Sequence, residues 1–200
     1  MANQIETKPP PPIWRRWFHL IAGSSIPLAG IFVSEWGMGA ALAVVSGGGF
    51  CLDLIRFRFQ WLNQRFMHWL SPLLKSDEGR RFTGATYMVV GALFAFLLFG
   101  AEVAVPVLLF LALGDPTAAL VGRRMPGPRI FGKSPGGTVA FVGLGLATVG
   151  VLTATGAVDY HWGLLVGALI AGVVELAPGY LDDNLTIPLI AGASMHFMGV

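Results

Sequence analysis

Residues Val103–Val121 read VAVPVLLFLALGDPTAALV, an apolar run that contains one charged side chain, Asp115. A helix needs roughly 20 mostly apolar residues to cross the hydrocarbon core of a bilayer, and this run is close to that length. The other apolar runs are Phe18–Val33, Trp36–Leu52, Gly84–Gly100, Gly137–Leu152, Trp162–Ala177 and Leu185–Val200. The sequence therefore predicts an all-α fold, a polytopic membrane helix bundle of about seven transmembrane helices.

The composition supports this fold class. Of the 200 residues, 54% are hydrophobic and only 12% are charged, about half the charged fraction of a typical soluble domain. These values exclude a disordered chain and a basic nucleic-acid-binding domain, and the single cysteine excludes an internal disulfide. We expect residues 1–13 to form a flexible, Pro-rich cytoplasmic tail and residues 14–200 to form a single integral-membrane catalytic domain.

The basic residues predict the orientation of the chain. All 13 lysines and arginines fall in three segments, residues 8–16, 56–81 and 123–133, which seven spans would place on the same side of the membrane. Because cytoplasmic loops collect Lys and Arg, we expect this face and the N-terminus to be cytoplasmic. The C-terminus is then outside or lumenal.

The segment Asp53–Arg81 is predicted to contain one interfacial amphipathic helix. Apolar residues recur in it at steps of three and four, at Ile55, Phe59, Leu62, Phe66, Trp69 and Leu73. This spacing is typical of a helix with one apolar face, and such a helix can lie in the plane of the membrane surface. The alternative interpretation is a plain basic connector.

Two groups of acidic residues stand at the ends of predicted spans, where ionisable side chains are costly and often functional. In the first, Asp115 follows Gly114 and precedes Pro116, an arrangement typical of a helix N-cap with proline at the first helical position. We therefore expect the span to break at Gly114 and restart. The alternative is that Asp115 only caps a helix.

The second group lies between the last two spans and consists of Glu175, Asp182, Asp183 and Asn184. These side chains all offer oxygen ligands, which suit Mg²⁺ better than a soft metal. A ridge of small residues, Gly163, Gly167 and Ala171, precedes Glu175 on one helix face, so this carboxylate should face the bundle interior or a polar cavity. The alternative is an ordinary polar turn that caps the last helix.

The segment Gly122–Thr138 has the composition of a phosphate-binding loop. It contains five glycines between Gly122 and Gly137, the hydroxyls of Ser134 and Thr138, and the cations Arg123, Arg124, Arg129 and Lys133. Charges, hydroxyls and exposed backbone N–H groups are what a triphosphate requires. Membrane topology alone would explain the cations but not the glycines. The sequence of Gly127–Ser134 matches the P-loop motif, but the strand that this motif requires does not precede it.

These motifs together resemble the CTP-dependent lipid kinases, a family that includes dolichol kinase, phytol kinase and the yeast-type diacylglycerol kinase and is related to the phosphatidate cytidylyltransferases. The matching residues are Gly114–Arg124, then Gly132-Lys133-Ser134 and Gly137–Ala140, and finally Glu175 with Asp182–Pro188. Weaker matches are Arg15–His19, with Arg16 and His19 as accessory candidates, and Glu78 with Phe82–Tyr87. Many members carry a Glu where this chain has Pro135-Gly136.

The resemblance implies transfer of the γ-phosphoryl group of CTP to an isoprenoid or other lipid alcohol, with Mg²⁺ or another divalent cation. By position, it implies metal or general-base roles for Asp115, Asp182 and Asp183. It implies phosphate binding by Lys133, Arg123 and Arg124, with Ser134 and the backbone of Gly136 and Gly137. Gly114, Gly122, Arg129 and Thr138 complete the predicted nucleotide site.

Two other functions are compatible with the same residues. A phosphatidate cytidylyltransferase would transfer CMP to a lipid phosphate, but the Gly-rich, Asp-containing C-terminal signature expected there is lacking. A small ion-coupled transporter would use Asp115 and Glu175 as a relay. It would then need carboxylates near the middle of the bilayer, whereas these acids gather toward one face.

Overall fold

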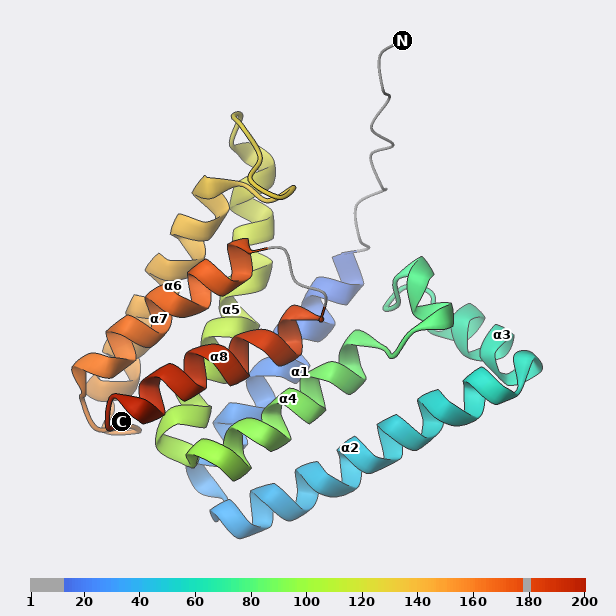
Figure 1. Cartoon of the computed structure of the whole chain (residues 1–200), viewed down its shortest axis with the longest axis horizontal. Coiled ribbons are helices and arrows are strands. Elements are labelled where there is room, and N and C mark those ends of the chain that lie inside the picture. The colour runs from blue at the N-terminus through green and yellow to red at the C-terminus, as the bar shows by residue number, and fades with distance from the viewer. Residues whose placement is uncertain (1–12, 178–180) are drawn as a thin grey trace.

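The structure, a computed structural model, describes residues 13–177 and 181–200 and is a bundle of helices (Figure 1). The predicted tail of residues 1–13 lies outside the described residues except for Ile13, which begins the first helix. The α-helices are α1 (Ile13–Phe32), α2 (Glu35–Arg58), α3 (Gln60–Trp69), α4 (Gly84–Phe99), α5 (Ala101–Arg124), α6 (Pro135–Ala154), α7 (Trp162–Leu176) and α8 (Asp183–Phe197). A short 3₁₀ helix, η1 (Ser76–Arg80), lies between α3 and α4.

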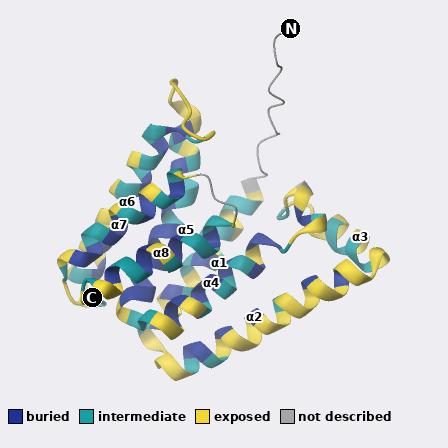
Figure 2. Ribbon diagram, in the orientation of Figure 1, coloured by how far each residue is buried: buried dark blue, intermediate teal, exposed yellow. Residues whose placement is uncertain are grey.

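The predicted all-α membrane bundle is confirmed. Each of the predicted spans coincides with one helix of the structure. By length and composition, α2, α5 and α6 could each cross a membrane, while α4 and α7 are shorter apolar helices. Large apolar side chains are exposed along the outer faces of the helices, among them Val44, Leu97, Val139 and Val173 (Figure 2). Soluble proteins rarely expose so much contiguous apolar surface, so these faces suit contact with lipid.

Helix α5 is the centre of the bundle. Every residue of its stretch 103–112 is buried, and the helix packs most extensively against α6 and α1 (Figure 2). A helix that is apolar all round belongs in the interior of a bundle, and this explains why the most continuous apolar run of the chain is enclosed by the others.

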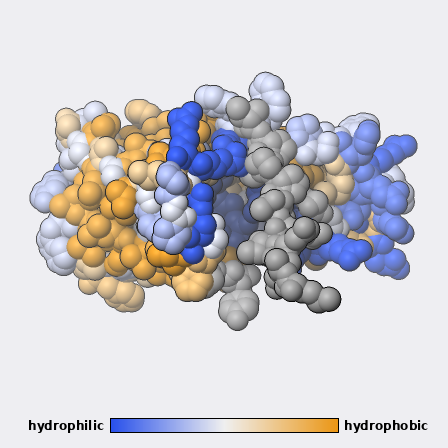
Figure 3. Space-filling model, turned by 90° about the horizontal axis from the view of Figure 1, so that it is seen from above, coloured by the Kyte–Doolittle hydropathy of each residue, from blue (hydrophilic) through white to orange (hydrophobic). Residues whose placement is uncertain are grey.

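Described members of the three basic segments line adjoining cavities at one end of the bundle, namely Arg15 and Arg16, Lys75 and Arg81, and Lys133. At this end the side chain of Lys133 contacts Asp183. At the opposite end the Glu35 carboxylate accepts a hydrogen bond from the Ala101 N–H at 2.9 Å. Seen from above, hydrophilic residues gather beside a central hollow and over the α3 end, whereas hydrophobic residues cover the other end of the molecule (Figure 3).

The predicted interfacial helix is only partly correct, because the periodic stretch forms two helices. Helix α2 continues to Arg58, and Phe59 then takes an extended conformation before α3 begins at Gln60. Helix α3 is 10 residues long, and none of its residues is buried. Its exposed Trp61 and Trp69 are of the type that anchors helices at a membrane surface. Its position at that surface stays a prediction.

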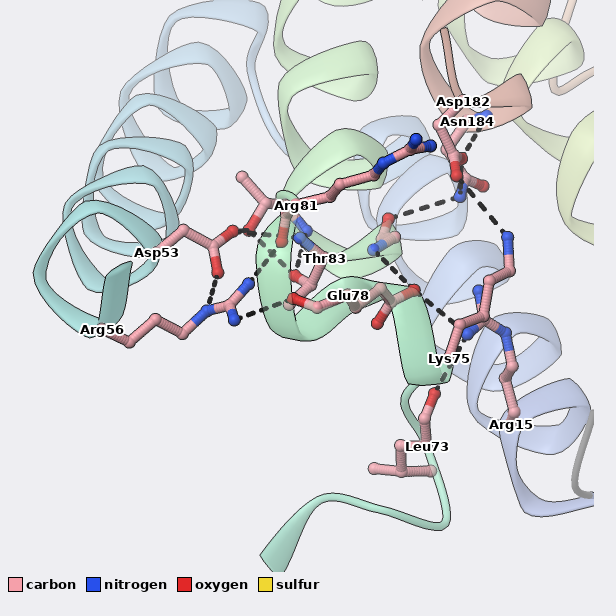
Figure 4. A network of polar contacts seen from close by, with 12 residues as sticks. Arg15, Asp53, Arg56, Leu73, Lys75, Glu78, Arg81, Thr83, Asp182 and Asn184 are labelled. Carbon is pink, nitrogen blue, oxygen red and sulfur yellow. Dashed lines mark hydrogen bonds and ion pairs between the residues drawn. The ribbon is translucent and has the colours of Figure 1, made fainter. Parts of the chain in front are cut away.

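A buried arginine joins α2, α3 and η1 (Figure 4). The Arg56 side chain is fully buried, and its guanidinium donates to Asp53 Oδ1 at 2.6 Å, Asn63 Oδ1 at 2.8 Å and the backbone oxygens of Glu78 at 2.8 Å and Arg81 at 2.6 Å. A buried charge is tolerated when it is paired and its donors are satisfied. Arg56 therefore fixes the path of the chain from α2 to η1.

The same network reaches the start of α4. The second oxygen of Asp53, Oδ2, accepts hydrogen bonds from the Thr83 N–H at 3.1 Å and the Thr86 hydroxyl at 2.7 Å. Thr83 also caps α4, because its hydroxyl accepts from the Thr86 N–H. The network thus ties the ends of α2 and α4 together beside the basic face.

Substitution of Arg56 by methionine should lower the free energy of unfolding by about 3–5 kcal/mol, because Asp53 would keep a buried, unpaired charge. Thermal unfolding in detergent measures the loss. Arg58→Met is the matched control, since Arg58 ends the same helix but is exposed. Equal stability of the two variants would contradict a structural role for the buried network.

Candidate functional site

The candidate site lies where α5 ends, α6 and α8 begin and α7 ends (Figure 1). Helix α5 contributes Asp115, the loop before α6 contributes Lys133, α7 contributes Glu175, and the start of α8 contributes Asp183. Three cavities meet around these residues and share them as walls. We name them the central, loop and outer cavities.

The cavities differ in their linings. The central cavity, about 230 Å³, is lined by Arg16, His19, Lys75, Asp115, Asp182 and Asp183, among others. The loop cavity, about 240 Å³, is lined by Asp115, Gly122, Arg123, Arg129, Lys133 and Ser134, among others. The outer cavity, about 600 Å³, is lined by Lys75, Arg81, Phe131, Lys133, Asp182 and Asp183, among others. Asp115 lines two of them, as do Lys133 and Asp183.

The predicted break in α5 is wrong, because the helix runs unbroken from Ala101 to Arg124 with Pro116 inside it. Proline has no N–H, so the carbonyl of Ala112 lacks its usual helical partner. The Thr117 hydroxyl donates to the neighbouring Leu113 carbonyl at 2.8 Å, and Gly114 lies close against the ring of Phe141. Asp115 is therefore not an N-cap; it is a side chain in mid-helix that lines both the central and the loop cavity.

Asp115 is also the acid of the cluster without an ionic partner. Within residues 13–177 and 181–200 it forms no ion pair, whereas Glu175, Asp182 and Asp183 each pair with a lysine. A carboxylate that lines a cavity and is not neutralised by a neighbour suits a bound cation or a polar substrate.

Lys133 connects the loop to α7 and α8. Its ammonium lies 2.8 Å from Asp183 Oδ2 and 3.2 Å from Glu175 Oε1, and it also donates to the backbone oxygen of Glu175. Burial by itself would lower the pKa of Lys133, but the hydrogen bond and charge of Asp183 and the charge of Glu175 outweigh burial and raise the pKa above its ordinary value. Lys133 is therefore a cation at neutral pH.

A tight turn presents Lys133 to these acids. Ile130 and Lys133 exchange backbone hydrogen bonds of 2.9 Å in both directions, and Phe131 and Gly132 between them have φ values of 51° and 86°. Two central residues with positive φ define a type I′ turn. Phe131 is a non-glycine residue in the left-handed region, which costs about 1–3 kcal/mol, so this turn stores strain beside the site.

Glu175 is buried, as the ridge of small residues predicted, with 5% of its surface exposed. The Thr138 hydroxyl donates to its Oε2 at 3.1 Å, and Lys133 neutralises it. The carboxylate holds α6, α7 and the loop together. Thr138 was predicted to bind nucleotide, and its hydroxyl is bonded to Glu175 in the structure.

The two acids at the start of α8, Asp182 and Asp183, make different contacts. Asp182 is the N-cap, because its Oδ1 accepts from the Asn184 N–H at 3.1 Å. The Asn184 amide donates to Asp182 at 2.6 Å and to the Gly84 carbonyl of α4 at 3.3 Å. The capping turn expected as the alternative is thus present for Asp182 and Asn184. Asp183 instead faces Lys133.

The predicted metal ligands do not form a cage by themselves. Within the described part of the chain, no three His, Cys, Asp or Glu side chains are grouped so that they could hold a metal ion. Mg²⁺, however, is commonly held by one or two carboxylates together with substrate phosphates and water. Asp115 and Asp183 both line the central cavity, so these two residues fit a magnesium–phosphate complex. Their role as ligands stays a prediction.

Two polar side chains from α1 point to a ligand in the central cavity. Arg16 Nη2 and His19 Nε2 are buried and lack a hydrogen-bond partner among the described residues, and both residues line this cavity with Asp115. Buried polar atoms without partners are rare in proteins. An anionic or hydroxyl-bearing ligand would satisfy them.

The remaining predicted residues divide into three groups. Gly122, Arg123, Arg129, Ser134 and Gly137 line the loop cavity. Arg124 is exposed at the end of α5, and Gly136 packs against Met125; neither lines the cavities described here. Glu78 accepts a hydrogen bond from Arg15 at 3.1 Å and one from the Gly84 N–H at 3.3 Å. It therefore joins α1 to the start of α4 (Figure 4).

Sequence reasoning missed Arg15, Asp53 and Arg56. Arg15 was counted as a topology signal and within the weaker family match Arg15–His19 but was given no role of its own, whereas it pairs with Glu78 and lines the central cavity. Asp53 and Arg56 were placed in the segment predicted to contain the interfacial helix, and no contact between them was predicted, although an acid and an arginine three residues apart at the end of an apolar helix signal an ion pair on one helix face.

Gly137 permits the close approach of α6 to α5. A Cβ atom at Gly137 would lie 2.6 Å from the backbone oxygen of Ala118, whereas one at Gly143 of the same helix would meet nothing within 4 Å. Gly137→Ala should therefore separate the helices and lower stability and activity, while Gly143→Ala should be neutral or stabilise by up to about 1 kcal/mol. Thermal unfolding and turnover of both variants test this. Equal stability and turnover of the two variants would contradict the close contact between α5 and α6.

The fold and the site together define a helical bundle of membrane-type composition whose acids and cations surround cavities at one end. The resemblance of this chain to the CTP-dependent lipid kinase family is confirmed by comparison with known proteins. The chain is 27% identical over 161 residues to CTP-dependent diacylglycerol kinase 1 of Schizosaccharomyces pombe, covering 73% of this chain and 74% of that protein.

Two further relatives extend the comparison. CTP-dependent diacylglycerol kinase 1 of Eremothecium gossypii is 26% identical over 169 residues, 72% of this chain and 53% of that protein. An uncharacterized protein of Rickettsia prowazekii is 25% identical over 187 residues, 88% of each chain. No protein-family model matches the chain, and no solved structure is significantly similar to it.

Proposed function

We propose that this protein is a CTP-dependent lipid kinase, which transfers the γ-phosphoryl group of CTP to the hydroxyl group of a membrane lipid. The observation that carries the proposal is the convergence of the central and loop cavities on Asp115, with Arg16, Arg123, Arg129 and Lys133 around them. The similarity to two CTP-dependent diacylglycerol kinases supports the same reaction.

The arrangement of charge fits phosphoryl transfer, which relies mainly on positioning and on electrostatic stabilisation of the phosphates. The cations of the loop cavity would bind the triphosphate. Asp115 and Asp183 would hold Mg²⁺, which neutralises charge on the phosphate oxygens. The lipid oxygen forms a bond to the γ-phosphorus as the bond between this phosphorus and the β–γ bridging oxygen breaks. CDP leaves, and the proton of the hydroxyl would pass to a carboxylate that lines the central cavity.

The lipid is proposed to be diacylglycerol, because two relatives carry that name. Polyprenol, dolichol and phytol are the isoprenoid alternatives that the sequence motifs indicated. The site is proposed to face the cytoplasm, since described residues of all three basic segments line its cavities and cytoplasmic segments collect Lys and Arg.

Transfer of label from CTP tests the reaction directly. The purified protein, reconstituted with Mg²⁺, is given CTP labelled at the γ or the α phosphate together with diacylglycerol, phytol, a polyprenol or phosphatidate. We expect label in diacylglycerol from the γ position only, with weaker transfer from ATP. Label in phosphatidate from the α position, with release of pyrophosphate, would assign the protein to the cytidylyltransferases. No transfer from either position would overturn the proposal.

A further inference from the structure

A fourth cavity, the apolar cavity, lies between α1, α3 and α4 and measures about 270 Å³. The apolar residues that line it include Phe18, Phe66, Leu70, Leu73, Ala85 and Met88. Cavities with such walls exclude water and accept apolar molecules. The motifs that predicted the nucleotide site do not account for this cavity.

The apolar cavity adjoins the central cavity. Arg15, His19 and Asn184 line both. Arg15 is engaged by Glu78 and Asn184 by Gly84 and Asp182, whereas His19 Nε2 is buried without a partner among the described residues. A polar group of a ligand would satisfy this nitrogen where the two cavities adjoin.

We propose that the apolar cavity binds the segment of the lipid alcohol next to its hydroxyl, and that His19 hydrogen-bonds this hydroxyl at the boundary with the phosphate site. The inference rests on the proposed kinase function and specifies where its acceptor enters. A hydroxyl attached to an alkyl chain is the chemistry that matches an imidazole at the end of an apolar cavity.

The size of the cavity limits what it holds. Pockets that enclose a drug-sized ligand measure about 300–1,000 Å³, so a cavity of about 270 Å³ encloses only part of a long-chain lipid. Leu70 and Ala85 in its wall are themselves exposed, so the cavity is open to the outside between α3 and α4. The rest of the chain extends through this opening into the bilayer.

Obstruction of the cavity provides the kinetic test. Ala85→Trp should raise the KM for the lipid at least about tenfold, as lost contacts in an apolar pocket do, and leave the KM for CTP unchanged. Ala43→Trp is the matched control, because Ala43 is exposed on α2 and lines none of the described cavities. An equal KM for the lipid in both variants would overturn the inference, as would a rise in the KM for CTP alone.

Photo-crosslinking separates this inference from the proposed function. A long-chain alcohol with a diazirine three or four carbons from its hydroxyl is activated on the wild-type protein, and labelled residues are mapped by mass spectrometry. We expect labels on Phe66–Leu73 and Ala85–Met88, which excess unlabelled alcohol removes. Labels confined to other helices would refute the cavity even if label passes from CTP to lipid. Labels on the cavity residues without transfer from CTP would refute the proposed kinase function and support binding of the alcohol in the apolar cavity.

His19→Gln tests the hydrogen bond, because glutamine keeps a polar group at this position. We expect His19→Leu to raise the KM for the lipid and His19→Gln to raise it less. The KM for CTP should stay close to that of the wild type. Identical kinetics of the leucine variant and the wild type would remove His19 from the acceptor site.

Discussion

Replacement of Asp115 by asparagine should lower kcat for phosphoryl transfer at least about a hundredfold, the loss commonly seen when one electrostatic group is removed from an active site. Asp115 is the carboxylate shared by the central and loop cavities, and it forms no ion pair within the described residues. Its charge is therefore available to a metal ion, and no structural contact depends on it. The label-transfer assay with γ-labelled CTP measures the loss.

The control for Asp115 lies on the same helix. Glu102→Gln removes a carboxylate from the first turn of α5, at the opposite end of the bundle, and should retain full activity. Both variants should unfold at the temperature of the wild type. Full activity of Asp115→Asn in folded protein would exclude Asp115 from the site, and a lowered unfolding temperature would show a structural role that the geometry does not contain.

Replacement of Lys133 by alanine should also lower turnover at least about a hundredfold, but with a second effect on stability. Lys133 neutralises Glu175, which is 5% exposed. Without the ammonium this carboxylate keeps a buried charge, which costs about 1–3 kcal/mol. We expect a clear drop in unfolding temperature together with the loss of activity.

A double variant separates the two effects of Lys133. Glu175→Gln removes the buried charge while its amide oxygen can still accept from Thr138, so the combination with Lys133→Ala should recover most of the stability. Activity should remain lost, because the cation of the loop cavity is still missing. Recovery of activity together with stability would show that Lys133 is structural only.

The sequence predicted the helices well and their interruptions poorly. Each span was found because apolar runs of sufficient length have few alternatives in a chain with this composition. The break at Gly114 was wrong because Asp-Pro signals an N-cap in an exposed context, whereas α5 is packed against other helices and stays helical through Pro116. Phe59 interrupts the periodic stretch that was predicted as one helix, although its spacing fits that helix.

The sequence identified the acids of the site but did not predict which of them form ion pairs. Which of Asp115, Asp182, Asp183 and Glu175 lacks a partner depends on where Lys133 and Lys75 lie. Lys133 is 42 residues from Glu175, and Lys75 is 107 residues from Asp182. Spacing along one sequence contains no information on such pairs. The apolar cavity was missed for the same reason, since its walls come from segments far apart in the sequence, in α1, α3, α4 and α8 and between α3 and α4.

The buried Arg56 constrains how this chain enters a membrane. Its guanidinium depends on the carbonyl oxygens of Glu78 and Arg81, which are synthesised 22 and 25 residues later. An arginine at the end of a helix can extend to the membrane surface, so the Arg56 guanidinium can stay hydrated there while the later residues are synthesised. Arg56 can become buried only after η1 and the start of α4 have been synthesised and have packed against it. We therefore expect residues from α2 to α4 to complete their insertion together, and truncation before Arg81 to leave Arg56 without these two carbonyl partners.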